Sequence, residues 1–129
     1  MYTGKDDCMK TFINFSNHPY AQWMQTQKEA AEEYGEVVDL PFPPVPPEAT
    51  CGDISEMADE YVSRIMGMNP GAVMCQGEFT LAFAVVAKLK SLGVEVLAAC
   101  SERKVTETVE SGITKKLIVY EFVQFRDYI

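Results

Sequence analysis

The sequence has no apolar stretch long enough to cross a membrane as a helix. Its first ten residues, Met1 to Lys10, are mostly polar and lack the apolar core of a secretory signal. We therefore expect a cytoplasmic protein. At 129 residues the chain is expected to form one domain over residues 11–129, preceded by a flexible stretch over residues 1–10.

Cysteine is sparse and widely spaced. The four cysteines, Cys8, Cys51, Cys75 and Cys100, form neither a zinc motif nor a CxxC redox pair. Cys75 and Cys100 lie in apolar stretches, which favours buried thiols over a catalytic cysteine. The dinucleotide-binding motif GxGxxG and the P-loop motif GxxxxGK[ST] are both missing. The sequence therefore predicts neither a bound metal nor a cofactor.

Positive charge is also scarce. The chain has 11 basic and 19 acidic residues, which gives a formal net charge of -8. Proteins that bind long nucleic acids or anionic lipids present basic surfaces, so neither kind of partner is expected. A small anionic ligand needs only a few local donors and is compatible with this charge.

The middle of the chain has the pattern of a strand, a glycine turn, a helix and a second strand. Residues 72–75 form a short apolar run, typical of a strand that is covered on both faces. Residues 80–92 carry apolar side chains at helical spacing, and Gly93 stands where a helix would end. Residues 94–99 are predicted to form the next strand. In open α/β sheets, ligands bind at the carboxyl ends of such strands.

Further strands and helices are predicted on both sides of this unit. Asp53 is the expected N-cap of the second helix, and Glu56 is its capping partner. The polar residues 101–104 are expected to end the fourth strand, and Glu110 to Gly112 to form a hairpin turn. The remaining elements are strands at 11–15, 36–40, 105–109 and 117–125 and helices at 19–34 and 54–66.

These elements predict an α/β protein, a three-layer Rossmann-like sandwich with a mainly parallel sheet and a C-terminal β-hairpin. The expected order of the parallel strands is 3-2-1-4, with the hairpin at the far edge. The proline-rich segment Pro41 to Pro47 is expected to be stiff and extended. It is interpreted as a connector, with a docking site for a polyproline-binding partner or a wall of the ligand cleft as alternatives.

Three polar clusters follow three of the predicted parallel strands. Because the carboxyl ends of parallel strands meet at one edge of a sheet, the clusters are expected to converge on one binding site. Such residues also turn the chain and cap helices, which is the alternative for each cluster alone. The clusters are residues 16–18, residues 76–80 and residues 101–104. Their candidate site residues are Ser16, Asn17 and His18; Gln76, Gly77, Glu78 and Thr80; and Ser101, Arg103 and Lys104.

Several of these side chains suit a phosphate ligand. His18 is the only histidine, and its ordinary pKa suits proton transfer near neutral pH. Ser16 and Asn17 are candidate donors to phosphate oxygens. Arg103 and Lys104 either contact a phosphate or solvate the hairpin.

Glu78 would repel a phosphate. It is interpreted either as a helix cap or as an acceptor for a ribose hydroxyl or an adenine amino group.

Four segments, in this order, resemble small CRISPR-associated proteins with a Rossmann-like, CARF-related fold. They are residues 12–19, 73–80, 97–103 and 122–128. Members of those families are homodimers that bind cyclic oligoadenylate second messengers across the two-fold axis. Several are ring nucleases, which linearise the messenger without a metal. The resemblance implies a homodimer with the same ligand and an antiviral role in the cytoplasm.

For cleavage of such a ligand, His18, Ser16 and Arg103 are the candidate catalytic residues. The candidate binding residues are Asn17, Gln76, Gly77, Glu78, Thr80, Ser101 and Lys104. The ring size, and whether the ligand is cut or only held, stay open. The alternatives are a non-catalytic sponge for cyclic nucleotides, a nucleoside deoxyribosyltransferase-like enzyme with Glu78 as nucleophile, and an interaction protein that uses residues 41–47.

Overall fold

The central strand of the sheet is β1 (Thr11–Ser16), and five of its six residues are buried. The computed structural model describes residues 10–129. Cys8, and residues 1–9 of the stretch that was predicted to be flexible, lie outside the described residues. The sheet has five strands in the order β2-β1-β3-β4-β5. The first four are parallel, and the last is antiparallel to its neighbour. The other strands are β2 (Glu36–Pro41), β3 (Pro70–Cys75), β4 (Val96–Glu110) and β5 (Ile113–Asp127).

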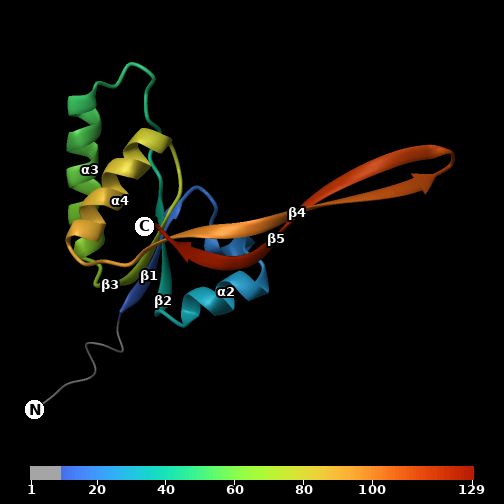
Figure 1. The fold of residues 1–129 in the computed structure, drawn as a ribbon, viewed down its shortest axis with the longest axis horizontal. Helices are drawn as coiled ribbons and strands as arrows, with labels where there is room; N and C mark the ends of the chain where they lie inside the picture. The colour runs from blue at the N-terminus through green and yellow to red at the C-terminus, as the bar shows by residue number, and fades with distance from the viewer. Residues whose placement is uncertain (1–9) are drawn as a thin grey trace, which may run out of the picture.

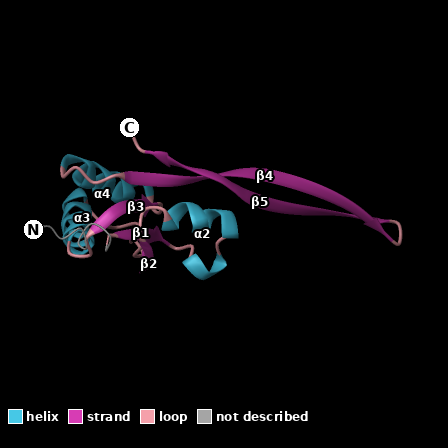
Figure 2. Cartoon of the chain, turned by 90° about the horizontal axis from the view of Figure 1, so that it is seen from below, coloured by secondary structure: helices cyan, strands magenta, loops and turns pink. Residues whose placement is uncertain are grey.

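Helices cover both faces of this sheet, because β1 presents apolar side chains to both sides. Phe12 packs on one face with Trp23 and helix α2 (Gln25–Glu32). Phe15 packs on the other face, in the layer formed by α3 (Cys51–Met66) and α4 (Phe79–Ser91). Figure 2 shows the helices on opposite sides of the strands. The predicted three-layer Rossmann-like fold, with a mainly parallel sheet and a C-terminal hairpin, is confirmed.

The predicted strand order 3-2-1-4 is wrong. The parallel strands lie in the order 2-1-3-4, with the first strand paired to both the second and the third. Apolar runs show which segments are buried strands, but they do not show which neighbour each strand takes. The predicted position of the hairpin at the edge of the sheet is correct.

The predicted break at residues 101–104 is also absent. β4 continues from Val96 to Glu110, with one register irregularity between Cys100 and Ser101. Residues 101–104 are polar because both faces of this part of the strand are exposed, not because the chain turns. The turn does come at Ser111 and Gly112, whose positive φ angles of 52° and 76° suit a two-residue hairpin turn.

The first helix is shorter than predicted. In place of one helix over 19–34, a 3₁₀ turn, η1 (Tyr20–Gln22), is followed by extended backbone at Trp23 and Met24, and only then by α2. The extended residues let the Trp23 side chain pack edge-on against Phe12, with ring centroids 6.1 Å apart.

The start of α3 also differs from the prediction. Its N-cap is Thr50, and the predicted cap Asp53 is instead the third helical residue. The backbone N–H of Asp53 donates to the Thr50 hydroxyl at 3.1 Å, and the Thr50 N–H donates to the Asp53 carboxylate at 2.9 Å. This reciprocal pair replaces the predicted pair of Asp53 with Glu56.

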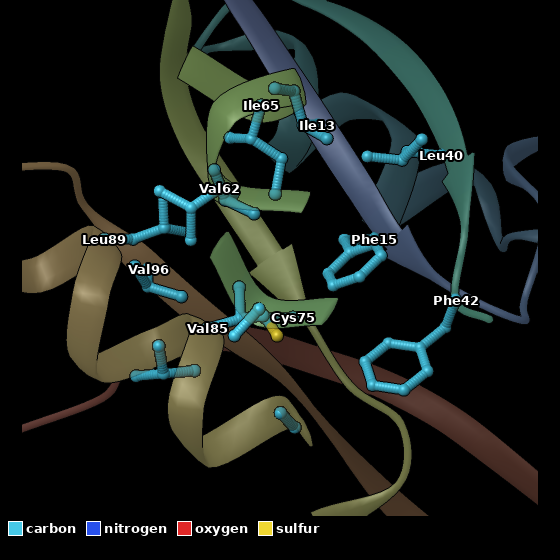
Figure 3. Close-up of a cluster of buried hydrophobic side chains, with 14 of the residues drawn as sticks. Ile13, Phe15, Leu40, Phe42, Val62, Ile65, Cys75, Val85, Leu89 and Val96 are labelled. Carbon is cyan, nitrogen blue, oxygen red and sulfur yellow. The ribbon is translucent and has the colours of Figure 1, made fainter. Parts of the chain in front are cut away.

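The larger part of the core lies between the sheet and α3 and α4 (Figure 3). The proline-rich segment connects β2 to α3 and also contributes Phe42, whose ring centroid lies 4.7 Å from that of Phe15. Cys75 is buried here as predicted, and burial raises the pKa of its thiol to about 12. Cys100 is only partly buried, and Cys51 is exposed. No helix within residues 10–129 combines the length and the apolar character needed to span a bilayer.

A long two-stranded arm projects from this body (Figure 1). We define the arm as residues 101–122, which comprise the outer parts of β4 and β5 and the turn between them. All residues from 101 to 120 are exposed. An isolated two-stranded hairpin is at best marginally stable in water, so the arm is the least supported part of the fold.

Candidate functional site

The strand order places a crevice between β1 and β3. From β1 the chain crosses to β2 through α2 on one face, whereas from β3 it crosses to β4 through α4 on the other face. The chain therefore leaves these two adjacent strands in opposite directions. In doubly wound sheets the crevice at the carboxyl ends of such a strand pair is where ligands bind. Residues 16–18 and 76–78 stand at these two strand ends.

A cleft of about 540 Å³ lies at this position. Its volume is in the usual range for small-molecule sites. Six of the predicted site residues line it, together with residues from the loop before α2, from α2 and β3, and from the arm. The lining residues are Ser16, Asn17, His18, Gln22, Met24, Gln27, Met74, Gln76, Gly77, Ala99, Ser101, Tyr120 and Phe122.

The first wall of the cleft is held by buried Asn14. Its amide nitrogen donates to the carbonyl of His18 at 2.9 Å and to a carboxylate oxygen of Asp39 at 2.8 Å. Its amide oxygen accepts from the Ser16 hydroxyl at 2.6 Å. The indole N–H of Trp23 also donates to the His18 carbonyl, at 2.9 Å. This network fixes the backbone of the loop and leaves the side chain of His18 exposed.

Ser16 belongs to the same network. Its hydroxyl donates to Asn14 and accepts from the backbone N–H of His18 at 3.2 Å, and the residue is only 7% exposed. The hydroxyl that was predicted to take part in catalysis therefore supports the loop. Asn17 and His18 are the exposed members of the first cluster.

The second wall begins where β3 and β4 separate. The side-chain oxygen of Gln76 accepts the backbone N–H of Ala99 at 2.6 Å, in place of a further rung of the ladder. The next residue, Gly77, lies directly on the ring of Phe42. A Cβ atom added at Gly77 would be 2.5 Å from three atoms of that ring. The turn therefore requires glycine for packing.

Glu78 and Thr80 do not line the cleft. The Glu78 carboxylate caps α4, accepting the backbone N–H of Leu81 at 2.8 Å and the Thr80 hydroxyl at 2.7 Å. The hydrogen bond from the Leu81 backbone, followed by the bond from the Thr80 hydroxyl, lowers the pKa of this carboxyl below its ordinary value of 4.5. The capping interpretation of Glu78 is the one that the geometry supports.

We expect this cap to make stability depend on pH. Because the folded-state pKa of Glu78 is lowered, the stabilisation is present above pH 4.5 and is lost as the pH falls through the folded-state value. Glu78→Gln should therefore have a lower melting temperature than the wild type at pH 7, and the difference should shrink toward pH 3. Melting curves over this range, with exposed Glu56→Gln as control, measure the effect. A difference that does not vary with pH would contradict the assignment.

The basic pair of the third cluster is divided between the two faces of the arm. Ser101 and Arg103 share the face that turns toward the cleft, since alternate residues of a strand point the same way. Lys104 lies on the other face, where its ammonium is 2.8 Å from Glu121 and 3.7 Å from Glu102. The hydrogen bond to Glu121 raises the pKa of Lys104 above its ordinary value. Arg103 is thus the nearer of the two to the cleft.

Sequence reasoning missed four important residues. Asn14 and Asp39 form the network beneath the loop, and Tyr120 and Phe122 form the wall on the arm. A polar residue in the apolar run of β1 was an available signal for Asn14. The two aromatic residues gave no comparable signal, because β5 is rich in apolar residues along its whole length.

The comparisons with known proteins match one family. A family model described as the uncharacterized protein MJ1673 family covers residues 10–126. The chain belongs to this family. No curated protein and no solved structure matches the chain. The residues matched by the MJ1673 family model include the three polar clusters and the arm.

The lining of the cleft decides what this member of the MJ1673 family can bind there. It offers amide, hydroxyl, imidazole and aromatic groups, and none of its side chains is lysine or arginine. Aromatic rings suit the face of a nucleobase, whereas amides and hydroxyls suit ribose and phosphate oxygens. Within residues 10–129 no three His, Cys, Asp or Glu side chains lie close enough together to hold a metal ion.

Proposed function

We infer that the cleft binds a cyclic oligoadenylate, shared between two copies of the chain, and linearises it. The observation that carries this proposal is that residues from all three polar clusters line one cleft at the carboxyl ends of β1 and β3. The sequence resemblance to CARF-related ring nucleases supplies the identity of the ligand and the role in cytoplasmic antiviral signalling. The aromatic wall of Tyr120 and Phe122 supports a base-containing ligand.

The proposed reaction uses only groups of the ligand and of the chain. A ribose 2′-hydroxyl attacks the adjacent phosphorus, the bond to the 5′-oxygen breaks, and a 2′,3′-cyclic phosphate and a 5′-hydroxyl form. The exposed imidazole of His18 takes the proton from the 2′-hydroxyl or gives one to the leaving oxygen. Asn17 donates to the phosphate oxygens, and Arg103 offsets the charge that develops on them. Alignment of the attacking oxygen contributes much of the rate.

A non-catalytic sponge is the second candidate, and one observation favours it. The Ser16 hydroxyl is already committed to Asn14 and His18, and the lining has one imidazole, that of His18, and no carboxylate to act as a second proton donor or acceptor. The deoxyribosyltransferase-like alternative is weakened, because the Glu78 carboxylate caps α4 outside the cleft lining.

The proposal is tested with cyclic tri-, tetra- and hexa-adenylate in the presence of a chelator, by following binding and products chromatographically. The expected result is a linear product from one ring size. His18→Ala should lower the rate by about 100-fold or more, while binding is largely kept. Thr106→Ala, on the arm and outside the cleft lining, is the control and should leave the rate unchanged.

The other outcomes separate the candidates. Tight binding with the ligand recovered intact identifies the sponge. Absence of both binding and cleavage for all three rings contradicts the proposed function.

A further inference from the structure

The outer edge of β5 is open along the arm from Ile113 to Glu121, whereas at Phe122 the backbone N–H donates to the sulfur of Met24 at 3.3 Å. β5 is the last strand of the sheet, and within residues 10–129 only β4 pairs with it. Leu117 and Tyr120 in this strand are 60% and 63% exposed. Long regular edges with apolar side chains pair readily with other strands, and native proteins usually cover or disrupt them. The outer edge of β5 in the arm is therefore a candidate site for pairing with a strand of another chain.

The sequence of this edge is complementary to itself. If residues 115–121 pair antiparallel with the same residues of a second copy, centred on Ile118, then Lys115 lies opposite Glu121. In the same register Leu117 lies opposite Val119, and Lys116 lies opposite Tyr120. Opposite charges, apolar pairs and a lysine facing an aromatic ring are all favourable cross-strand neighbours.

Other registers lose this match. If the two-fold axis is normal to the sheet, the side chains on one face of an arm continue onto the same face of the partner arm. Because side chains alternate between the two faces, the neighbouring registers shift the partner strand by two residues. A shift in one direction puts Glu121 opposite Ile113, and a shift in the other puts it opposite Leu117. Both place a carboxylate against an apolar side chain, so the register centred on Ile118 is favoured.

The distribution of charge also favours a second copy as the partner. The arm carries four acidic and four basic residues, so the whole net charge of -8 lies on the rest of the chain. The bodies of two copies repel each other, whereas the arms do not. A contact through the arms holds the bodies apart. A pair in which both copies use the same patch is closed and does not grow into a filament.

This pairing brings a cation to the cleft. Lys116, Ile118, Tyr120 and Phe122 alternate along β5 and so share one face, and Tyr120 and Phe122 line the cleft. In the register centred on Ile118, Lys116 of the second copy lies next to Tyr120. The cleft has no lysine or arginine in its own lining.

We propose that two copies pair through residues 115–121 of β5 and that each gives Lys116 to the cleft of the other as a ligand for phosphate. The role of Lys116 rests on the proposed function, but the pairing does not. The opposite face of the same segment places Lys115 against Glu121, away from the cleft. The two adjacent lysines therefore have different roles.

The pairing is tested by light scattering on the full chain after size-exclusion chromatography. The wild type should be a dimer. Ile118→Glu should be a monomer, because two carboxylates would face each other at the axis. Val109→Glu is the matched control, since Val109 is exposed on the same face of the arm but outside the paired segment, and it should remain a dimer. A monomeric wild type, or a dimeric Ile118→Glu, overturns the pairing.

The role of Lys116 is tested with inorganic phosphate as the probe, at protein concentrations where each variant is a dimer. Lys116→Gln should bind phosphate about fivefold more weakly or worse, whereas Lys115→Gln should bind it like the wild type. Equal affinity in all three proteins, or equal weakening in both variants, overturns the role of Lys116.

The two proposals fail in different ways. A wild-type monomer that still binds cyclic oligoadenylate overturns the pairing and leaves the proposed function standing. A dimer that binds phosphate through Lys116 but does not bind any cyclic oligoadenylate supports the pairing and removes the proposed function.

Discussion

Replacing Gly77 by alanine should lower the free energy of unfolding by about 1–3 kcal/mol, the usual cost of overpacking a core. The added Cβ would lie 2.5 Å from the ring of Phe42, which is only 4% exposed and packs against Phe15. The ring cannot move away without disturbing that contact. Urea denaturation followed by far-ultraviolet circular dichroism measures the change. Because Gly77 also lines the cleft, ligand affinity should fall in the same variant.

A matched glycine in α3 provides the control. A Cβ at Gly52 would meet only the Thr50 hydroxyl, at an ordinary contact distance of 3.6 Å. Gly52→Ala should therefore be neutral or slightly stabilising, since alanine is the better helix former. If both variants lose the same stability, the contact between Gly77 and Phe42 is not the cause. Partial rescue of Gly77→Ala by Phe42→Leu would support the contact directly.

Replacing Asn14 by alanine should lower the free energy of unfolding by about 2–4 kcal/mol, because several buried polar groups lose their partner at once. Asn14 is fully buried and bonds to His18, Asp39 and Ser16. The loop that carries His18 should also become mobile. Trp23 is the only tryptophan and donates to the same His18 carbonyl, so its fluorescence should shift to longer wavelength in the variant.

Asn17 is the matched control for Asn14. It has the same side chain, lies three residues later in the chain and is exposed. Asn17→Ala should change the free energy of unfolding by less than about 0.5 kcal/mol, as is usual for surface positions. It should still weaken ligand binding if Asn17 contacts phosphate. A loss of stability in Asn17→Ala as large as in Asn14→Ala would contradict the assigned network.

The fold could be predicted from the sequence wherever burial alone decides the structure. β1 and β3 contain short apolar runs, as is typical of strands that are covered on both faces, and Gly93 follows the end of α4. The order of the strands could not be predicted, because it depends on which side of the sheet each crossover takes. The continuation of β4 through residues 101–104 was missed for a different reason. In an arm with both faces exposed, a strand looks like a polar turn.

The site could be predicted in part. The rule that parallel strand ends converge predicted that Ser16 and Gln76 lie together, and the structure places both in one cleft. Ser101 lines the same cleft, although β4 continues through this residue and does not end there. The rule does not distinguish residues that face the ligand from those that support the backbone, so Glu78 was included although it caps α4. The aromatic wall could not be predicted, because it depends on how the arm leaves the body.

The position of β1 has a consequence for the order of events in folding. β1 pairs with β2, about 25 residues later, and with β3, about 60 residues later, so its hydrogen bonds cannot be completed until residue 75 has been made. The arm closes through a two-residue turn between adjacent strands, and hairpins of this kind form in about 1–10 μs. Of the five strands, the last to be synthesised therefore has the shortest search for its partner. The central strand is the first of the five, and its hydrogen bonds are completed only after two later strands have been made.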